Sequence, residues 1–307
     1  MRFIKEIYNY VTKNIKLGEM KMYTGKVIDF HVHVGNFSML RNDIQDLLML
    51  KNASRDFDVQ KVFSEPAHLI PYLEAAGIEI AVLLGEDGPG TNYHITSQFV
   101  CEFRNRTPDE HKDMFVCLGS LNPNKITSTP LEKYHFDIES GVLGYKLYPS
   151  EHNFDPLSDA LLEVYSEMEK NRHILMFHTG ESAQVDSVDK WQNPADFKMI
   201  PEKFPNLTVV LAHGGKKKYA DEAFDMLIKY PNVYMDTGFI TTSMLSEMYP
   251  DISKVADKIL FASDLPGGVS SLIKYIQNFR EMSLSEDEVS KILYYNAKKV
   301  LDKVLRM

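Results

Sequence analysis

The feature that most restricts the fold of this chain is a regular alternation between short apolar runs and longer amphipathic segments. Eight runs have the length of a strand: residues 26–32, 78–84, 113–118, 141–148, 173–178, 207–213, 232–236 and 258–264. Continuous apolar runs of this kind are typical of parallel strands buried on both faces, with crossover helices between them. Eight such units are the number that a closed barrel of parallel strands requires.

We therefore predict an α/β fold, a regular or distorted (β/α)₈ TIM barrel with an extra N-terminal helix. A single domain accounts for the whole chain, 1–307, because the sequence has no linker, internal repeat or low-complexity tract. Residues 26–307 form the barrel. Residues 1–25 form a helical extension, since their apolar residues recur at helical spacing.

Two further segments have a predicted place in the barrel. Residues 36–65 are polar and weakly periodic, and we interpret them as an enlarged loop after the first strand. Residues 285–305 carry a strong apolar stripe at helical spacing, with Ser285 as the capping residue. We expect this helix to complete the outer ring of the barrel.

Charge and cysteine content narrow the functional classes. The formal net charge is -9 and the sequence pI is near 5.6, which argues against nucleic-acid binding because a phosphate backbone needs a basic face. We expect a small-molecule substrate instead. Two cysteines are too few for a disulfide framework, so we expect a cytoplasmic protein, and no apolar run is long enough for membrane insertion. The sequence leaves a homo-oligomer open.

The first predicted strand ends with two histidines, His31 and His33, separated by one residue. Because side chains alternate along a strand, both imidazoles point the same way, and at the end of a barrel strand they point into its mouth. Two imidazoles on one side can share an ion. His-X-His alone is a weak signal, since such pairs arise by chance.

Other predicted strands also end in polar side chains: His178, His213 and Asp264. The C-terminal ends of the strands are where barrel enzymes place their catalytic groups. Imidazole nitrogens and a carboxylate are ligands that zinc and related ions accept, and a catalytic site leaves one position open for water. We therefore predict a divalent metal at this end of the barrel.

The chain resembles the amidohydrolase superfamily, and within it the amidohydrolase-related family of lactonase-like hydrolases and decarboxylase-like lyases. The likeness runs from about Val27 to Leu301. The motifs that carry it are IDFHVH, HLIPYLEAAGIEIAVLL, GYKLYPS, FHTGE, LAHGG, NVYMDTG, FASDLP and YNAKKVL. Together they are specific for the family and not for a substrate.

This resemblance assigns roles to the residues at the strand ends. It makes His31, His33 and His178 metal ligands, Asp264 a ligand and proton acceptor, and His213 a catalytic group or a ligand of a second metal. It implies a divalent ion, for which we favour Zn²⁺ over Mn²⁺ or Fe²⁺.

Lys146, in the motif GYKLYPS, has three alternative roles. It resembles a lysine that is carboxylated in dihydroorotase-like relatives and bridges two metals, in which case His213 would bind the second ion. Alternatively, Lys146 holds an anionic substrate, or it pairs with a carboxylate. We favour a single ion. Glu181, His152 and Lys216 also lie just beyond strand ends and are candidates to line the substrate pocket.

Three functions follow from this reading. The first is a hydrolase that uses metal-activated water on an amide, lactone or other carbonyl-centred bond of a small, preferably anionic molecule. The second is a non-oxidative, metal-dependent decarboxylase that uses the same site. The third is a barrel that binds a ligand without turnover, which the complete set of expected ligands disfavours.

Overall fold

The computed structural model of the chain describes residues 23–53, 58–88, 94–182, 187–269 and 271–305. The helix predicted within residues 1–25 falls almost entirely on residues 1–22, which lie outside the described residues. The boundary at residue 25 therefore stays a prediction. Within the described ranges, no helix combines the length and the apolar character needed to span a bilayer.

A single sheet of eight parallel strands forms the centre of the molecule. The strands in sheet order are β1 (Val27–His33), β2 (Ile78–Leu84), β5 (Phe115–Ser120), β6 (Gly144–Leu147), β7 (Ile174–His178), β8 (Thr208–Ala212), β9 (Val233–Asp236) and β10 (Ile259–Leu260). Every neighbouring pair in this order is parallel. This confirms the predicted strands, and the bounds of β2 agree with the prediction at both ends.

The sheet closes on itself between its first and last strands. The backbone N–H of Phe30 in β1 donates to the carbonyl of Phe261 just after β10, at 2.9 Å. The backbone N–H of Asp264 in turn donates to the carbonyl of His31, also at 2.9 Å. We refer to this line of contact between residues 30–33 and 261–265 as the seam. The seam makes the predicted TIM barrel a closed structure.

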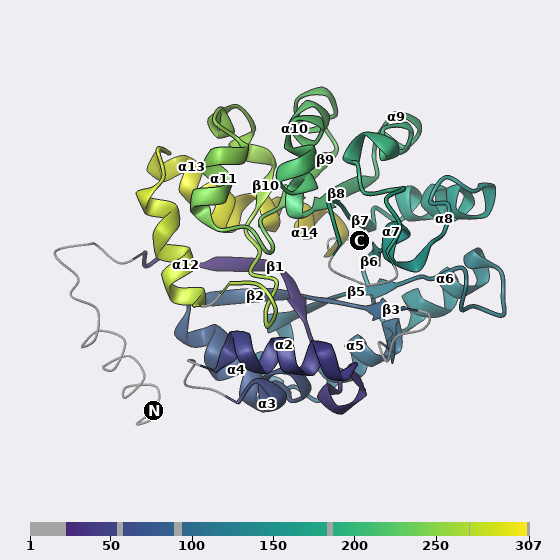
Figure 1. The fold of residues 1–307 in the computed structure, drawn as a ribbon. Helices are drawn as coiled ribbons and strands as arrows, with labels where there is room; N and C mark the ends of the chain where they lie inside the picture. The colour runs from purple at the N-terminus through teal and green to yellow at the C-terminus, as the bar shows by residue number, and fades with distance from the viewer. Residues whose placement is uncertain (1–22, 54–57, 89–93, 183–186, 270, 306–307) are drawn as a thin grey trace.

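Helices surround the barrel and cover its ends (Figure 1). They are α2 (Asn42–Asn52), α3 (Val59–Ser64), α4 (Pro66–Ala75), α5 (Ser97–Asn105), α6 (Pro130–Glu139), α7 (Pro149–His152), α8 (Asp159–Lys170), α9 (Met199–Lys203), α10 (Ala220–Lys229), α11 (Thr242–Met248), α12 (Leu272–Asn278), α13 (Glu286–Ser290) and α14 (Asn296–Leu305).

The prediction of a loop over residues 36–65 was wrong, because α2 and α3 lie within that stretch. Side chains of this segment such as Leu48 and Phe63 are buried, so tertiary packing stabilises helices that weak periodicity did not indicate.

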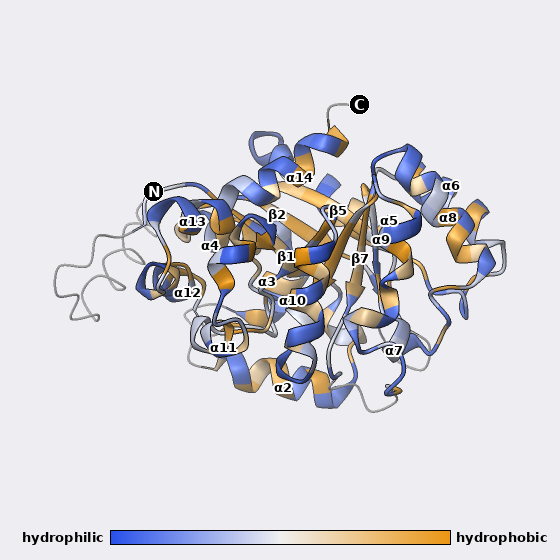
Figure 2. Ribbon diagram, turned by 90° about the horizontal axis from the view of Figure 1, so that it is seen from above, coloured by the Kyte–Doolittle hydropathy of each residue, from blue (hydrophilic) through white to orange (hydrophobic). Residues whose placement is uncertain are grey.

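The last helix closes one end of the barrel and does not join its outer ring. Val300, Leu301 and Val304 of α14 are buried in one cluster with alternate residues of the strands, such as Ile28 and Phe30. Figure 2 shows α14 at one end of the strands, with α2 and α7 at the other. The helix itself was predicted, and Ser285 forms the expected capping box at the start of α13. Its apolar stripe plugs the N-terminal end, so the C-terminal end is left for a site.

Candidate metal centre

An irregularity in β1 turns both of its histidines toward the mouth of the barrel. Phe30 belongs to the apolar cluster inside the barrel, so strict alternation would point His31 and His33 away from the interior. The pairing of β1 with β2 shifts between Asp29 and Val32, as in a β-bulge, and reverses the direction of the side chains that follow. The prediction that the two imidazoles face the same way agrees with the structure, where their Nε2 atoms lie 3.0 Å apart.

Asp29 stabilises this irregularity. Its buried carboxylate accepts hydrogen bonds from the backbone N–H groups of His31, at 3.2 Å, and of Ser263 across the seam, at 2.9 Å. Burial raises the pKa of Asp29 to about 7, although its hydrogen bonds from Ser263 and His31 oppose the change. Sequence analysis did not assign Asp29 a role. We assign Asp29 a positioning role: it holds β1 against the segment that follows β10.

Asp264 brings a carboxylate to the two histidines from the other side of the seam. Its Oδ1 lies 3.2 Å from Nε2 of His33 and 3.6 Å from Nε2 of His31. One ligand atom from each of these three side chains lies within 4.8 Å of the others, as a shared metal ion requires. The structure thus places three of the four predicted ligands together.

The backbone of Asp264 and of His213 is in the left-handed region, with φ values of 56° and 63°. This conformation is uncommon for residues other than glycine, and aspartate and histidine tolerate it better than bulky or branched residues. Strained backbone of this kind clusters at functional sites, where the surrounding structure holds it in place. Both residues follow the ends of strands that face the mouth.

A second carboxylate, Asp236 at the end of β9, orients the ring of His31 and holds the backbone of His213. Its Oδ2 lies 2.7 Å from Nδ1 of His31, and its Oδ1 accepts from the backbone N–H groups of His213, at 2.8 Å, and Gly238, at 3.0 Å. Burial alone would raise the pKa of Asp236, but the neighbouring His31, His213 and Lys146 outweigh it and lower the pKa to about 2. The ionised carboxylate therefore holds the Nδ1 proton of His31 and leaves Nε2 free for a metal.

Replacing Asp236 with asparagine is expected to lower metal affinity by about 10- to 100-fold, because the ring of His31 loses the partner that fixes its tautomer and direction. Titration of the metal-depleted protein with Zn²⁺ would measure the change. Asp251→Asn is the matched control, since Asp251 is exposed and pairs with Lys254 on the surface. Equal affinity in the two variants would contradict the role of Asp236.

His213 lies between His178 and His31, with its ring centroid 4.7 Å from that of His178 and 5.0 Å from that of His31. Nε2 of His178 is buried and has no hydrogen-bond partner among the described residues. Oε1 of Glu151 lies 3.5 Å from this Nε2. His178 is not part of the three-residue group around Asp264, so its role as a ligand stays a prediction. Nδ1 of His213 lies 2.9 Å from the carbonyl oxygen of Gly238, which leaves its Nε2 for other partners.

The protonation states of these groups suit a cation. Burial and the charge of Lys146 lower the pKa of His31. The same two causes lower the pKa of His213 to about 3. Burial also holds the pKa of His178 well below its usual value. Burial of Asp264 would raise its pKa, but the adjacent His31 and His33 outweigh this and hold the pKa far below the ordinary value. Neutral imidazoles and an ionised carboxylate are the forms that bind a metal, so the residues present fit a divalent ion.

Lys146 lies on β6 and is fully buried next to this group. Its Nζ has no hydrogen-bond partner among the described residues and sits 4.9 Å from the ring centroid of Tyr148. Burial lowers the pKa of Lys146, and four carboxylates oppose the change: Asp236, Asp264, Glu151 and Glu86. An amine with a lowered pKa is the form that carboxylation needs, and an ammonium is the form that holds an anionic substrate. Its role stays a prediction.

Two glutamates of the site, Glu86 and Glu151, were not predicted, and their side chains have little exposure. Glu86 begins the short strand β3 (Glu86–Asp87), which pairs antiparallel with β4 (His94–Ile95). Glu151 lies in α7 and accepts a hydrogen bond from Oγ of Ser182 at 2.6 Å. Burial raises the pKa of both glutamates, and the charge of Glu151 raises that of Glu86 further. A glutamate in a polar loop gives no sequence signal of such burial.

The three residues predicted to line the pocket differ in their placement. The side-chain Nζ of Lys216 is directed to the backbone carbonyl of Glu181, while Glu181 itself is exposed. His152 is buried with its ring centroid 5.1 Å from that of Tyr148, and burial lowers its pKa to about 4. None of the three belongs to the groups of ligand atoms around His31. Their contact with a substrate stays a prediction.

Comparison with known proteins identifies a family for this chain. The family model described as Amidohydrolase matches residues 28–303. A search of curated proteins found no match.

Solved structures share the fold over nearly the whole chain. An uncharacterised TIM-barrel protein, Bb4693 from Bordetella bronchiseptica, is 22% identical with a TM-score of 0.71, over 92% of this chain and 100% of the other. The 2,6-dihydroxybenzoate decarboxylase from Rhizobium is 16% identical with a TM-score of 0.60, over 91% and 99% of the two chains. A probable 2-pyrone-4,6-dicarboxylic acid hydrolase from Acinetobacter baumannii is 12% identical with a TM-score of 0.61, over 90% and 99%. At these identities the likenesses establish the barrel fold alone.

Proposed function

Since this chain belongs to the amidohydrolase family, we propose that it is a metal-dependent hydrolase that cleaves an amide, lactone or other carbonyl-centred bond of a small, anionic molecule. The observation that carries the proposal is the approach of His31, His33 and Asp264 to within 4.8 Å of one another at the mouth of the barrel. His178 would complete the ligand set, since its buried Nε2 lacks a partner among the described residues.

When bound there, a divalent ion would polarise a carbonyl oxygen and make hydroxide available near neutral pH. Asp264 stays ionised at neutral pH, so one of its oxygens can accept a proton and later deliver it to the leaving group. The neutral Nε2 of His213 can accept a hydrogen bond from water or from the substrate, because Nδ1 is directed to the carbonyl of Gly238. Asp236 holds His31 in place during these steps.

The lysines support an anionic substrate. Lys146 is buried beside the ligand group, and Lys216 extends over the ring of Phe239 at 5.6 Å from its centroid. The carboxylates Asp264 and Glu151 act on both ammonium groups. A substrate carboxylate that approaches either lysine would take over part of the electrostatic stabilisation that Asp264 and Glu151 provide.

We propose Zn²⁺ as the ion, with Mn²⁺ and Fe²⁺ as alternatives, because imidazole and carboxylate ligands accept all three. One ion would use the group of His31, His33 and Asp264; the ligand atoms of His31, His213 and Asp236 also lie within 4.8 Å of one another. A second ion requires carboxylation of Lys146 and would recruit His213. With both cysteines free and buried, we also propose a cytoplasmic location.

A substrate panel, tested with and without metal, examines this function. The purified protein is depleted with a chelator, reloaded with Zn²⁺ or Mn²⁺, and incubated with lactones, amides and unsaturated or aromatic carboxylates. We expect hydrolysis of a lactone or amide only after reloading, measured by acid release at constant pH for lactones and by chromatography of the acid and amine products for amides. Full activity in the depleted protein would contradict the proposal. Release of carbon dioxide without hydrolysis would instead establish the alternative, a decarboxylase that uses the same ligands.

A further inference from the structure

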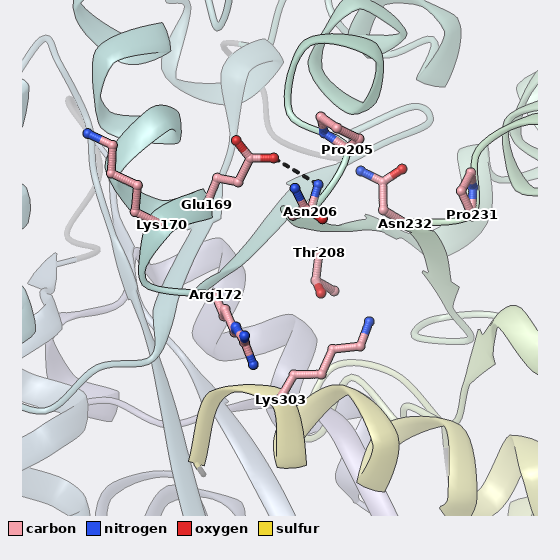
Figure 3. A pocket seen from close by; sticks show the side chains of 9 residues that line it. All are labelled: Glu169, Lys170, Arg172, Pro205, Asn206, Thr208, Pro231, Asn232 and Lys303. Carbon is pink, nitrogen blue, oxygen red and sulfur yellow. Dashed lines mark hydrogen bonds between the residues drawn. The ribbon is translucent and has the colours of Figure 1, made fainter. Parts of the chain in front are cut away.

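A hollow of about 670 Å³ is lined by the residues drawn in Figure 3. It lies at the opposite end of the barrel from the metal centre. Its wall includes Thr208, the first residue of β8, and Asn232, the residue before β9. Both mark the N-terminal ends of strands, whereas the predicted ligands lie at the C-terminal ends. The turn after α8 and the last turns of α14 form the other sides. The hollow is therefore separate from the catalytic mouth.

Three positive side chains in this hollow and the adjoining one have no acidic partner among the described residues. Figure 3 shows Arg172, after α8, and Lys303, on α14, extending into the same space from two elements. Lys299 lies one turn before Lys303 and lines an adjoining hollow together with Arg172. Among the described residues, none of these three cations has a carboxylate within ion-pair distance. Lys170, which also lines the hollow, differs because it pairs with Glu167 at 2.6 Å, and Lys298 in the adjoining hollow pairs with Asp302.

Overall composition does not explain this excess of positive charge, since the chain has a net charge of -9. The acid in the wall of the hollow, Glu169, uses its carboxylate to accept the backbone N–H of Asn206 at 2.8 Å. Burial and the repulsion of Lys299 lower the pKa of Lys303. Burial, Lys299 and Lys303 also lower the pKa of Lys258, which Asp257 opposes. These lysines therefore repel one another, and a bound anion would relieve the repulsion.

The backbone of Arg172 gives a second, independent observation. Its φ is 54°, in the left-handed region, where a glycine is the least costly residue. It follows α8 in a Schellman motif, with hydrogen bonds from Arg172 N to Glu169 O at 3.0 Å and from His173 N to Met168 O at 2.8 Å. The chain thus has an arginine where helix termination favours glycine. Strained backbone of this kind clusters at functional sites, which favours a role for the Arg172 side chain.

We propose that this hollow binds the phosphate group of a small molecule. A guanidinium offers paired N–H donors that match phosphate oxygens, and lysine ammonium groups supply further charge to a dianion. Several cations from α14 and from the turn after α8 converge on one concave surface, which suits a compact, multiply charged group better than a single carboxylate. The volume leaves room for the remainder of the molecule.

Calorimetric titration of the full chain at constant ionic strength tests this site, with inorganic pyrophosphate and inorganic phosphate as probes. We expect saturable binding of both, tighter for pyrophosphate because it carries more charge. Lys303→Ala should weaken binding of pyrophosphate at least fivefold. Lys112→Ala removes the same charge from a lysine that pairs with Asp109 outside the hollow, and it should leave the affinity unchanged. Absence of binding, or equal affinity in both variants, would overturn the proposal.

Arg172→Gly separates binding from folding. Because glycine relieves the left-handed strain, this variant should have the same or a higher midpoint of thermal unfolding, yet bind pyrophosphate at least fivefold more weakly. Asp264→Asn should keep the wild-type affinity for pyrophosphate, which excludes binding at the metal centre. Loss of binding in Asp264→Asn, or undiminished binding in Arg172→Gly, would place the anion elsewhere and refute the site.

Discussion

Replacing Asp264 with asparagine is expected to lower kcat/KM by about 10³-fold while the barrel stays folded. The amide has nearly the shape of the carboxylate, but it cannot accept the proton that we assign to Asp264 and it is a weaker ligand. Asparagine also tolerates the left-handed backbone of this position, where φ is 56°. Steady-state kinetics on the substrate found in the panel, with metal content measured in the same samples, would quantify the loss.

A matched control for Asp264→Asn is Asp196→Asn, which changes an aspartate in the turn Pro194–Phe197, outside the ligand groups. It should retain wild-type kcat/KM. If Asp264→Asn keeps activity within tenfold of wild type, the proton-transfer role is wrong. If its metal content falls in parallel with its activity, Asp264 acts chiefly as a ligand.

The second large effect is expected for His178→Ala. Loss of a metal ligand should reduce metal affinity more than a hundredfold, beyond the effect of losing a group that only orients a ligand. Activity should fall with the metal content and recover in part when excess Zn²⁺ is added. Elemental analysis of the purified variant and kinetics at several metal concentrations would measure both. This result would decide whether His178, whose Nε2 is buried, belongs to the ligand set.

His173→Ala provides the comparison for His178→Ala. Both histidines belong to the segment around β7, but His173 precedes the strand, and its Nδ1 lies 2.9 Å from the hydroxyl of Tyr134. We expect this variant to lose some stability and to keep its full metal content. A normal metal content in His178→Ala as well would remove His178 from the predicted ligands.

The strands and their ends could be predicted because a barrel imposes a simple pattern on the sequence. Each buried parallel strand needs a short apolar run, and its C-terminal residue faces the mouth. This pattern predicts that His31, His33 and Asp264 share the mouth, and the structure brings them together. Asp236 closes a predicted strand in the same way, so the pattern was sufficient to find it, although sequence analysis gave it no role.

Other parts of the site depend on contacts that a sequence does not express. Asp29 acts through hydrogen bonds across the seam to a residue more than 200 positions away. The side chains of Glu86, in β3, and Glu151, in α7, have little exposure because of tertiary contacts that their local sequence does not indicate. The apolar stripe of α14 predicts burial of one face but not the surface that it covers. For that reason the plug at the N-terminal end could not be anticipated.

The seam has a consequence for how such an enzyme can change over evolutionary time. Its closure uses main-chain atoms of Phe30, His31 and Asp264, while the proposed chemistry uses the imidazole and carboxylate groups of the last two. Substituting those side chains leaves the hydrogen bonds that join the first and last strands available. New reactions can therefore arise at the same positions whose main-chain atoms close the barrel, without loss of the fold.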